Sequence, residues 1–365
     1  MISLYIHIPF CKTICSYCDF PKIIAKDELK SKYIENIVNE INNLKIKKDE
    51  IYTIYIGGGT PNSISINLLK NLFEALKKYL YCSKENTIEL NPELINDELI
   101  KLLVDYNFNR VSIGVESIVD SVIKTLNRHH NKQMVIDKIN KLKLAGINNI
   151  NLDFMFGIDK TTLDDIKTDL DFIKQMDVTH ISYYSLILEE NTVLMHLYKQ
   201  NKFKPLDEDL CADMYEYICK YLKSIGFNHY EISNFSKPGF ESKHNLVYWE
   251  CKEYIGIGCG ASSYYDDYRI DNERILLRYL KNNEVNKEYI DLQERKREFF
   301  LLGLRKLSGV KISDYIAKFN SDPLADFDFS ELIKNGLIKV SNDTIYIPED
   351  KILLANLVYE NFVSN

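Results

Sequence analysis

Strand-like and helix-like segments alternate along the first half of this 365-residue chain. Short apolar runs predict buried strands, and the segments between them carry apolar residues three and four positions apart, which predicts helices with one buried face. We expect strands over residues 4–8, 51–56, 87–90, 110–114, 149–154 and 180–188, and helices over 28–44, 66–81, 97–106, 120–126, 133–145 and 162–176. Because successive parallel strands need helical connections, this order predicts an α/β fold, either an open wound sheet or a partial barrel.

The rest of the chain departs from this alternation. Residues 205–290 contain a helix-like segment over 207–225 and a strand-like one over 229–233, followed by stretches rich in Gly, Tyr and Ser that we expect to be loops. Short helix-like segments and two short strands then follow. The sequence predicts three parts: a barrel-like domain in 1–204, an α+β extension in 205–290 and a small helical or winged-helix-like domain in 291–365.

Charge and hydropathy exclude several classes of protein. The 46 basic and 53 acidic residues give a formal net charge of -7, without a long basic block, so we expect no nucleic-acid partner. The N-terminus lacks a basic segment followed by an apolar core, and no long uninterrupted apolar stretch occurs. We therefore expect no membrane span and a cytoplasmic location, where thiols stay reduced.

Three cysteines, Cys11, Cys15 and Cys18, lie on one loop directly after the first expected strand. Thiolates bind iron–sulfur clusters and zinc, but a structural zinc site ordinarily has four ligands. A [4Fe-4S] cluster held by three thiolates keeps one iron open for another ligand. The alternative is a Cys3His zinc knuckle, which lacks a fourth ligand at finger-like spacing because His7 lies on the preceding strand. The other cysteines are scattered, and we expect no role for Cys82, Cys211, Cys219, Cys251 and Cys259.

The segment from Tyr5 to Cys18 resembles the radical S-adenosylmethionine (SAM) enzymes. The stretch YIHIPFC at 5–11, followed by the CxxxCxYC spacing, is similar to the HemN/HemW group in particular. This resemblance implies a partial (β/α)6 barrel with a [4Fe-4S] cluster in the loop after the first strand. It also implies that SAM binds the open iron. In this group the cluster receives an electron from a donor such as flavodoxin or ferredoxin. Transfer of this electron to SAM cleaves the SAM sulfonium and gives a 5′-deoxyadenosyl radical.

A triple glycine, GGGTP at 57–61, follows the second expected strand. Glycines let a backbone approach a ligand closely, although an ordinary strand-end turn is the alternative. The resemblance implies that Gly58, Gly59 and Thr60 contact SAM and that Tyr5 and Tyr17 pack beside it.

Four charged residues fall near the ends of later strands, where barrel sites are built. They are Glu89, Glu116, Arg128 and Asp153, and the resemblance implies that they bind SAM. Carboxylates can accept the amino group or the ribose hydroxyls, and Arg128 can pair with the methionine carboxylate. For each residue alone, a surface ion pair is the alternative. The group usually has Gln where this chain has Glu116.

The motif HNLVYW at 244–249 resembles the HNxxYW signature of HemW-type proteins, the haem chaperones related to HemN. Histidine is a common axial ligand of haem, so His244 is the expected ligand, with Tyr248 and Trp249 covering a porphyrin face. The alternative is a hydrogen-bonded loop histidine with an aromatic anchor.

Two features favour the HemW type over HemN, the oxygen-independent coproporphyrinogen III dehydrogenase. HemN-type enzymes have a CxxxCxFCxC motif and a segment before the first strand, whereas Asp19-Phe20 follows Cys18 here and Tyr5 lies four residues from Met1. We expect a haem chaperone that binds a [4Fe-4S] cluster, SAM and haem and passes haem to an acceptor protein. The alternative is an enzyme that decarboxylates coproporphyrinogen III or another porphyrin-like substrate.

Overall fold

The computed structural model describes residues 1–363, and one sheet of 12 strands organises most of them. Its order is β12-β11-β10-β9-β1-β2-β3-β4-β5-β6-β8-β7. The parallel core consists of β1 (Ile2–Ile8), β2 (Ile51–Gly58), β3 (Glu85–Leu90), β4 (Arg110–Glu116), β5 (Asn149–Phe156) and β6 (His180–Ser185). The connecting helices are α1 (Asp27–Asn42), α2 (Ile66–Leu80), α3 (Asp97–Asp105), α4 (Asp120–Thr125), α5 (Lys132–Leu144) and α6 (Leu163–Met176).

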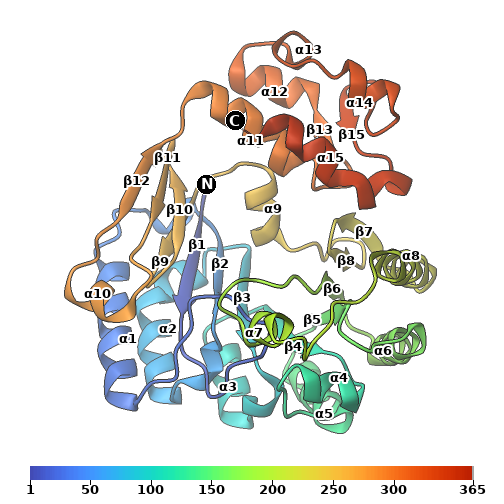
Figure 1. Ribbon diagram of the computed structural model, residues 1–365. Helices are drawn as coiled ribbons and strands as arrows, with labels where there is room; N and C mark the ends of the chain where they lie inside the picture. Colours follow the sequence, from blue (N-terminus) through green and yellow to red (C-terminus); the bar gives the residue numbers. More distant parts are fainter. Residues whose placement is uncertain (364–365) are drawn as a thin grey trace.

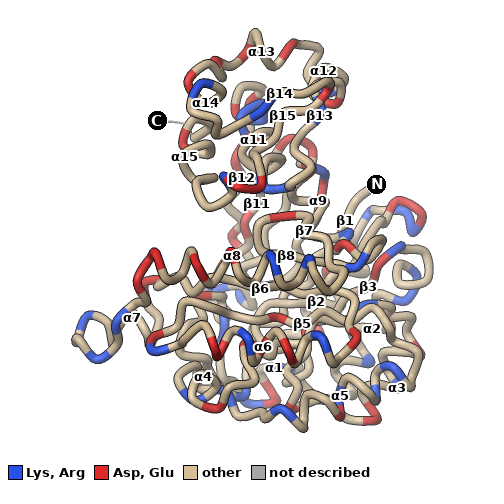
Figure 2. The backbone as a smooth tube through the Cα atoms, turned by 90° about the vertical axis from the view of Figure 1, so that its right-hand side faces the viewer, with Lys and Arg blue, Asp and Glu red and all other residues tan. Residues whose placement is uncertain are grey.

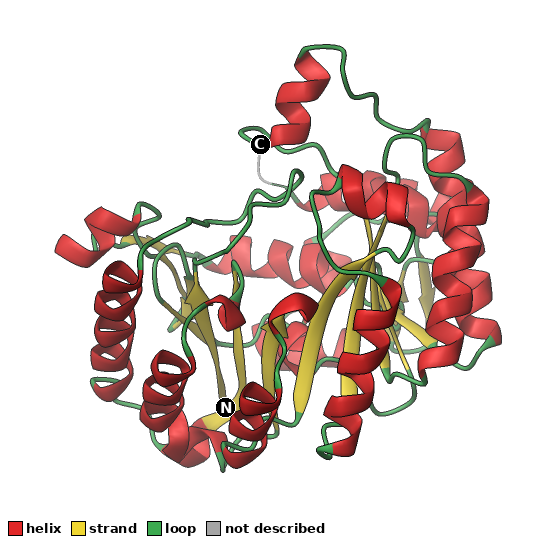
Figure 3. Ribbon diagram, turned by 90° about the horizontal axis from the view of Figure 1, so that it is seen from below, coloured by secondary structure: helices red, strands yellow, loops and turns green. Residues whose placement is uncertain are grey.

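The predicted α/β fold is confirmed, and of its two forms the chain adopts the partial barrel. The strands run parallel from β1 to β6, helices lie outside them, and the sheet curves without closing (Figure 3). The last core strand ends at Ser185, earlier than expected, and α7 (Val193–Lys199) follows it. Beyond β6 the antiparallel strands β8 (Asn234–Ser236) and β7 (Asn228–Glu231) extend the sheet.

Helix α2 illustrates how the sequence builds the outer layer. Ser65 caps its first turn by accepting the Leu68 N–H, and the helix buries one face against the sheet. Fully buried apolar residues recur every three or four positions, at Leu69, Leu72, Phe73 and Leu76. Each such side chain contributes about 1.5–3 kcal/mol to folding.

The two faces of the parallel strands differ in polarity, and this difference creates the site. On β4, Val111, Ile113 and Val115 belong to the hydrophobic core. The alternate residues of the strand face the barrel interior. They are Arg110, Ser112, Gly114 and Glu116, and all of them line one pocket.

The stretches rich in Gly, Tyr and Ser that follow residues 229–233 were expected to be loops, and this expectation is wrong for much of residues 254–289. They contain β9 (Tyr254–Ile257), β10 (Ser262–Tyr265), β11 (Tyr268–Asp271), α10 (Leu276–Lys281) and β12 (Asn286–Tyr289). Strand β9 pairs parallel to β1, and β10 and β11 form a hairpin. The hairpin turns at Asp266 and Asp267, with φ of 53° and 61°. Aspartates tolerate this left-handed conformation, which two-residue hairpin turns require.

The C-terminal domain is small and mostly helical. It contains α11 (Leu292–Gly303), α12 (Ile312–Phe319), α13 (Pro323–Asp326), α14 (Ser330–Lys334), α15 (Ala355–Tyr359) and a sheet ordered β13-β15-β14. These strands are β13 (Val310–Lys311), β14 (Lys339–Ser341) and β15 (Thr344–Tyr346). The domain lies beyond the amino ends of the core strands, with α9 (Lys243–Trp249) between it and the barrel, while α8 (Glu208–Ser224) flanks the sheet (Figure 1).

Basic and acidic residues are interspersed along the backbone (Figure 2). None of the helices in residues 1–363 combines the length and apolarity needed to cross a lipid bilayer.

Candidate cluster and cofactor site

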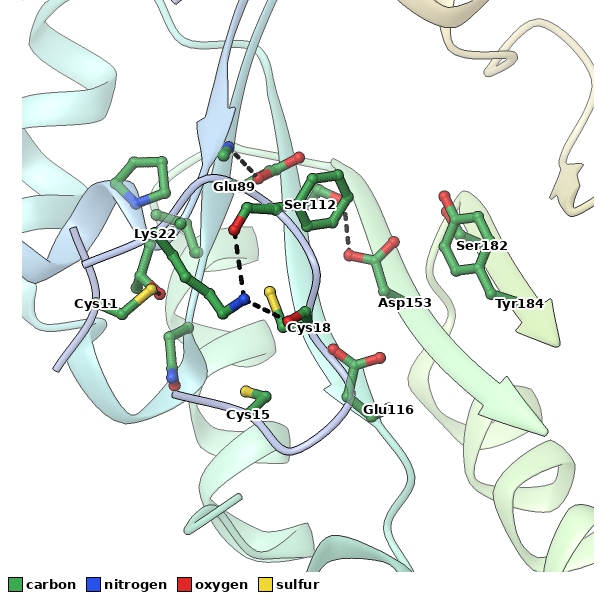
Figure 4. A pocket seen from close by; sticks show the side chains of 18 of the residues that line it. Cys11, Cys15, Cys18, Lys22, Glu89, Ser112, Glu116, Asp153, Ser182 and Tyr184 are labelled. Carbon is green, nitrogen blue, oxygen red and sulfur yellow. Dashed lines mark hydrogen bonds between the residues drawn. The ribbon is translucent and has the colours of Figure 1, made fainter. Parts of the chain in front are cut away.

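The interior of the partial barrel contains a pocket with a cavity of about 370 Å³. The three cysteines, on the loop that follows the carboxyl end of β1, line it (Figure 4). The predicted residues that line it are Cys11, Cys15, Tyr17, Cys18, Gly58, Gly59, Thr60, Glu89, Glu116, Arg128 and Asp153. The fold thus brings together side chains that are far apart in the sequence, from Cys11 to Asp153.

The cysteine loop is fixed to the barrel through its backbone. The N–H of Cys11 donates to the carbonyl of Ile23 at 3.1 Å, and the N–H of Ser16 donates to that of Leu126 at 3.3 Å. Cys11, Cys15 and Cys18 are free thiols. Within the described residues no three Cys, His, Asp or Glu side chains converge on a position for a single metal ion. A [4Fe-4S] cube binds each thiolate to a different iron, so it fits spaced cysteines on one loop.

Two hydrogen-bond donors and one further cation approach the thiols. The hydroxyl of Thr60 lies 3.5 Å from Sγ of Cys11, and Nη1 of Arg128 lies 3.6 Å from Sγ of Cys15. Burial raises the pKa of Cys18 to about 11, which the nearby Lys22 partly opposes. Cys18 therefore holds a neutral thiol at neutral pH until a metal centre displaces its proton. No sequence signal pointed to Lys22, although its side chain points toward the cysteines (Figure 4).

Each of the three glycines at the end of β2 is needed for close packing. A Cβ on Gly57 would lie 2.8 Å from the Glu89 carboxyl carbon, and one on Gly59 would lie 3.0 Å from Sγ of Cys11. Gly58 has a φ of +115°, and its Cβ would lie 2.5 Å from the His7 ring. The glycines thus let the end of β2 approach the cysteine loop and His7, in addition to any ligand.

The pocket contains three carboxyl groups, of which that of Glu116 is buried and those of Glu89 and Asp153 are half-buried. Glu89 accepts hydrogen bonds from the Tyr55 hydroxyl at 2.8 Å and from the Gly58 N–H at 3.0 Å. Burial still raises the pKa of Glu89 to about 7. Burial also raises the pKa of Glu116 to about 7, against the opposing charge of Arg128, and raises that of Asp153. A cationic ligand would favour the ionised form of all three, so the pocket suits a positively charged molecule.

Tyr5, His244, Tyr248 and Trp249 do not line this pocket. The Tyr5 hydroxyl instead lies 2.9 Å from Nδ1 of His7. His244 is 1% exposed and stacks on Tyr55. The next residue, Asn245, does line the pocket, so α9 lies against the inner end of the cavity.

Both nitrogens of His244 have partners. Nδ1 lies 2.7 Å from Oγ1 of Thr53, and Nε2 lies 2.9 Å from the Tyr248 hydroxyl. Because the Thr53 hydroxyl donates to Ser3 at 2.7 Å, its oxygen accepts the Nδ1 proton. The lone pair is then on Nε2, the arrangement that metal-binding histidines adopt. On the far side of α9, the Arg305 guanidinium lies 4.5 Å from the Trp249 ring centroid.

Two protein families match separate parts of the chain. Residues 5–173 match the Radical SAM superfamily, and residues 290–350 match the HemN C-terminal domain. The partial barrel, the cysteine loop and this match define a radical SAM protein.

Relatives identify the family more closely. The protein called Heme chaperone HemW in Lactococcus lactis subsp. lactis is 38% identical, over 99% of this chain and 97% of its own length. The Bacillus subtilis protein of the same name is 34% identical over 100% of this chain and 99% of its own length. The Escherichia coli protein of that name is 30% identical over 100% of this chain and 98% of its own length. The chain belongs to the HemW family.

A solved structure supports the fold. Coproporphyrinogen III oxidase (HemN) from Escherichia coli matches with a TM-score of 0.84 at 20% identity, over 99% of this chain and 89% of that one. At this identity the likeness concerns the fold. It confirms the predicted radical SAM barrel, and the HemN C-terminal domain match accounts for the last part of the chain.

Proposed function

We propose that this protein is a haem chaperone that holds a [4Fe-4S] cluster and SAM, binds haem and transfers it to an acceptor protein. The observation that supports this most is the similarity along nearly the whole chain to proteins called Heme chaperone HemW. The proposal includes a cytoplasmic location and a reductant such as flavodoxin or ferredoxin.

The cluster would be held by Cys11, Cys15 and Cys18, which belong to one loop and one pocket. When bound, the cluster supplies electrons and SAM supplies a reducible sulfonium. The protein's own part is to keep the thiols close to Arg128 and Lys22, whose positive charges favour the thiolate form.

SAM would lie in the cavity beside the cluster loop. Its ammonium and sulfonium carry positive charge, which the carboxyls of Glu89, Glu116 and Asp153 can balance. Arg128 can bind the methionine carboxylate through its planar guanidinium. The backbone of Gly58 and Gly59, with the side chains of Thr60 and Tyr17, would form the wall. Tyr5 would act through His7 instead of touching SAM, because its hydroxyl is directed to that ring.

Haem would take His244 as its axial ligand, with Tyr248 and Trp249 beside the porphyrin. The lone pair on Nε2 and the Nδ1–H bond to Thr53 suit this role. Since Nε2 accepts from Tyr248, haem would have to displace that hydroxyl, and α9 would have to move from its buried position.

The test is anaerobic reconstitution followed by two parallel assays. In the first, titration with haem should give a Soret band that saturates near one haem per chain. In the second, the reduced protein with SAM should not convert coproporphyrinogen III to protoporphyrinogen IX. Efficient conversion would instead establish the alternative, a coproporphyrinogen III dehydrogenase. Saturable haem binding without conversion supports the chaperone.

A further inference from the structure

A buried arginine lies in the cavity without a partner. Arg110, the first residue of β4, is 1% exposed and lines the pocket. Its Nε has no hydrogen-bond partner, and within residues 1–363 its guanidinium forms no ion pair. The Thr87 hydroxyl, on the residue paired with Arg110 in the neighbouring strand, is also buried without a partner.

An isolated buried cation is costly, because it loses hydration without gaining compensating interactions. Arginine does not relieve this cost by losing its proton. Other charged groups of the interior act on Arg110 only at longer range, namely Glu89 and Asp153, whose pKa values its charge lowers. The protein thus keeps in a cavity a buried guanidinium whose Nε has no partner and that forms no ion pair within the described residues, as expected for a group that a ligand completes.

Arg110 is far from the cluster end of the cavity. Six residues separate it from Glu116 on the same strand, about 20 Å at roughly 3.3 Å per residue. Arg128, the other arginine of the pocket, is engaged at the Glu116 end, where it donates to the Gly114 carbonyl. The cavity therefore has an arginine at each end, with Lys22 beside the cysteines as its third cationic side chain. The charge of Arg110 also acts on His244 of α9, whose Asn245 lines the same pocket.

We propose that the guanidinium of Arg110 binds a carboxylate of the ligand that fills the inner end of this cavity. The planar fork of arginine matches a carboxylate with two parallel hydrogen bonds. Two ligands of the proposed function carry this group, a propionate of haem and the methionine carboxylate of SAM, so the identity of the ligand rests on that function. The SAM carboxylate would bind Arg110 only in place of the contact with Arg128 proposed above. The proximity of α9 favours the propionate.

Blocked carboxylates test this inference directly. The reconstituted wild-type protein is titrated with haem and with haem dimethyl ester, and separately with SAM. The same titrations are made with Arg110→Met, Arg110→Lys and the control Arg295→Met. Arg295 also has a buried Nε without a partner, but it pairs with Asp267 outside the pocket.

If a propionate binds Arg110, wild type should prefer haem over the ester by about tenfold, the effect of one charge-assisted hydrogen bond. Arg110→Met should lose this preference, Arg110→Lys should retain part of it, and Arg295→Met should retain all of it. If the methionine carboxylate is bound instead, SAM affinity should fall about tenfold in Arg110→Met while haem binding is unchanged.

The inference is overturned if SAM affinity is unchanged in both Arg110 variants and wild type binds haem and its ester equally, or binds no haem. If wild type binds no haem and Arg110→Met has reduced SAM affinity, the chaperone proposal is contradicted. The inference that Arg110 binds a ligand carboxylate is then still supported. Thermal melting separates a structural role. Arg110→Met should melt no lower than wild type, because it removes an unpaired buried charge. A melting temperature lowered by several degrees, with unchanged ligand affinities, would show that Arg110 supports only the fold.

Discussion

The imidazole of His244 lies 2.7 Å from the hydroxyl of Thr53, although the two residues are 191 positions apart in the chain. This contact joins α9, which carries the HNLVYW motif, to the strand that ends in the triple glycine. The backbone N–H groups of Lys243 and His244 also donate to the buried carboxylate of Glu85 on the next strand, at 3.1 and 3.0 Å. The motif is therefore attached to the barrel at its inner end and is not part of a free surface loop.

The first prediction concerns access of haem to His244. Tyr248→Phe removes the hydroxyl that donates to Nε2 at 2.9 Å and leaves the lone pair free. Because one hydrogen bond contributes about 1 kcal/mol, we expect haem to associate about fivefold faster, with a similar Soret maximum. Stopped-flow absorbance of the reconstituted protein measures the rate.

His244→Ala is the matched variant for this prediction. It should shift or abolish the Soret band while the iron and sulfide contents stay at the wild-type level, because α9 and the cysteine loop are separate segments. A normal Soret band in His244→Ala would rule out His244 as the axial ligand.

The second prediction concerns the cluster. Reconstituted wild type should contain about four irons and four sulfides per chain, and Cys15→Ala should lose most of both, because two remaining thiolates hold the cube poorly. Cys82→Ala is the control, since Cys82 is an exposed free thiol outside the pocket. Iron and sulfide analysis with the visible absorption spectrum measures the outcome. One zinc per chain in wild type would contradict the cluster assignment.

Local sequence patterns predicted much of this fold and of the candidate site. The apolar runs predicted all six core strands, because a strand buried on its outer face requires them, and the spacing of Cys11, Cys15 and Cys18 placed three thiols on one loop. The hairpin at Asp266 and Asp267 was missed, because its strands are short and partly polar and gain stability by pairing with the flanking strands β9 and β12.

The approach of charged groups could not be predicted in the same way. Lys22 lies beside the cysteines because of the path of its loop. Arg110 is the first residue of a strand, and a polar residue at that position does not by itself indicate a buried charge. Whether a buried charge has a partner depends on side chains from several strands, which no single segment of sequence specifies.

The third prediction separates backbone strain from crowding at Gly58. Gly58→Ala should lower the free energy of unfolding by more than about 2 kcal/mol, since its φ is +115° and the added methyl would lie 2.5 Å from the His7 ring. His7 holds the Pro21 carbonyl at 2.9 Å, so its displacement should also lower cluster content. Urea unfolding and iron analysis measure the two effects.

Gly146→Ala is the control for this variant. Gly146 has a similar φ of +93°, but an added Cβ meets nothing within 4 Å. It should therefore show only the backbone cost of about 1 kcal/mol and a normal cluster content. Equal losses of stability and of iron in the two variants would show that contact with His7 is unimportant.

The last prediction concerns the pH dependence of stability. Asp169 on α6 is 1% exposed and accepts from the Ile118 N–H at 2.8 Å and from the Ser117 hydroxyl at 2.9 Å. Burial outweighs these hydrogen bonds and raises its pKa from 3.8 to about 7. Since the folded state binds this proton more tightly, its contribution to stability is fully present below about pH 3.8 and is lost as pH rises through 7.

Asp169→Asn should therefore flatten the decline in unfolding free energy between pH 5 and pH 8, and should stabilise the protein at pH 8 by about 1–3 kcal/mol. The amide keeps an oxygen for the Ile118 N–H, and its NH2 group can donate to the Ser117 hydroxyl. Asp171→Asn on the same helix is the control, because that side chain is exposed and should leave the pH profile unchanged. Urea unfolding at four pH values measures both variants. If Asp169→Asn keeps the wild-type slope, the carboxyl of Asp169 is ionised in the folded protein throughout this range, and burial does not control its proton.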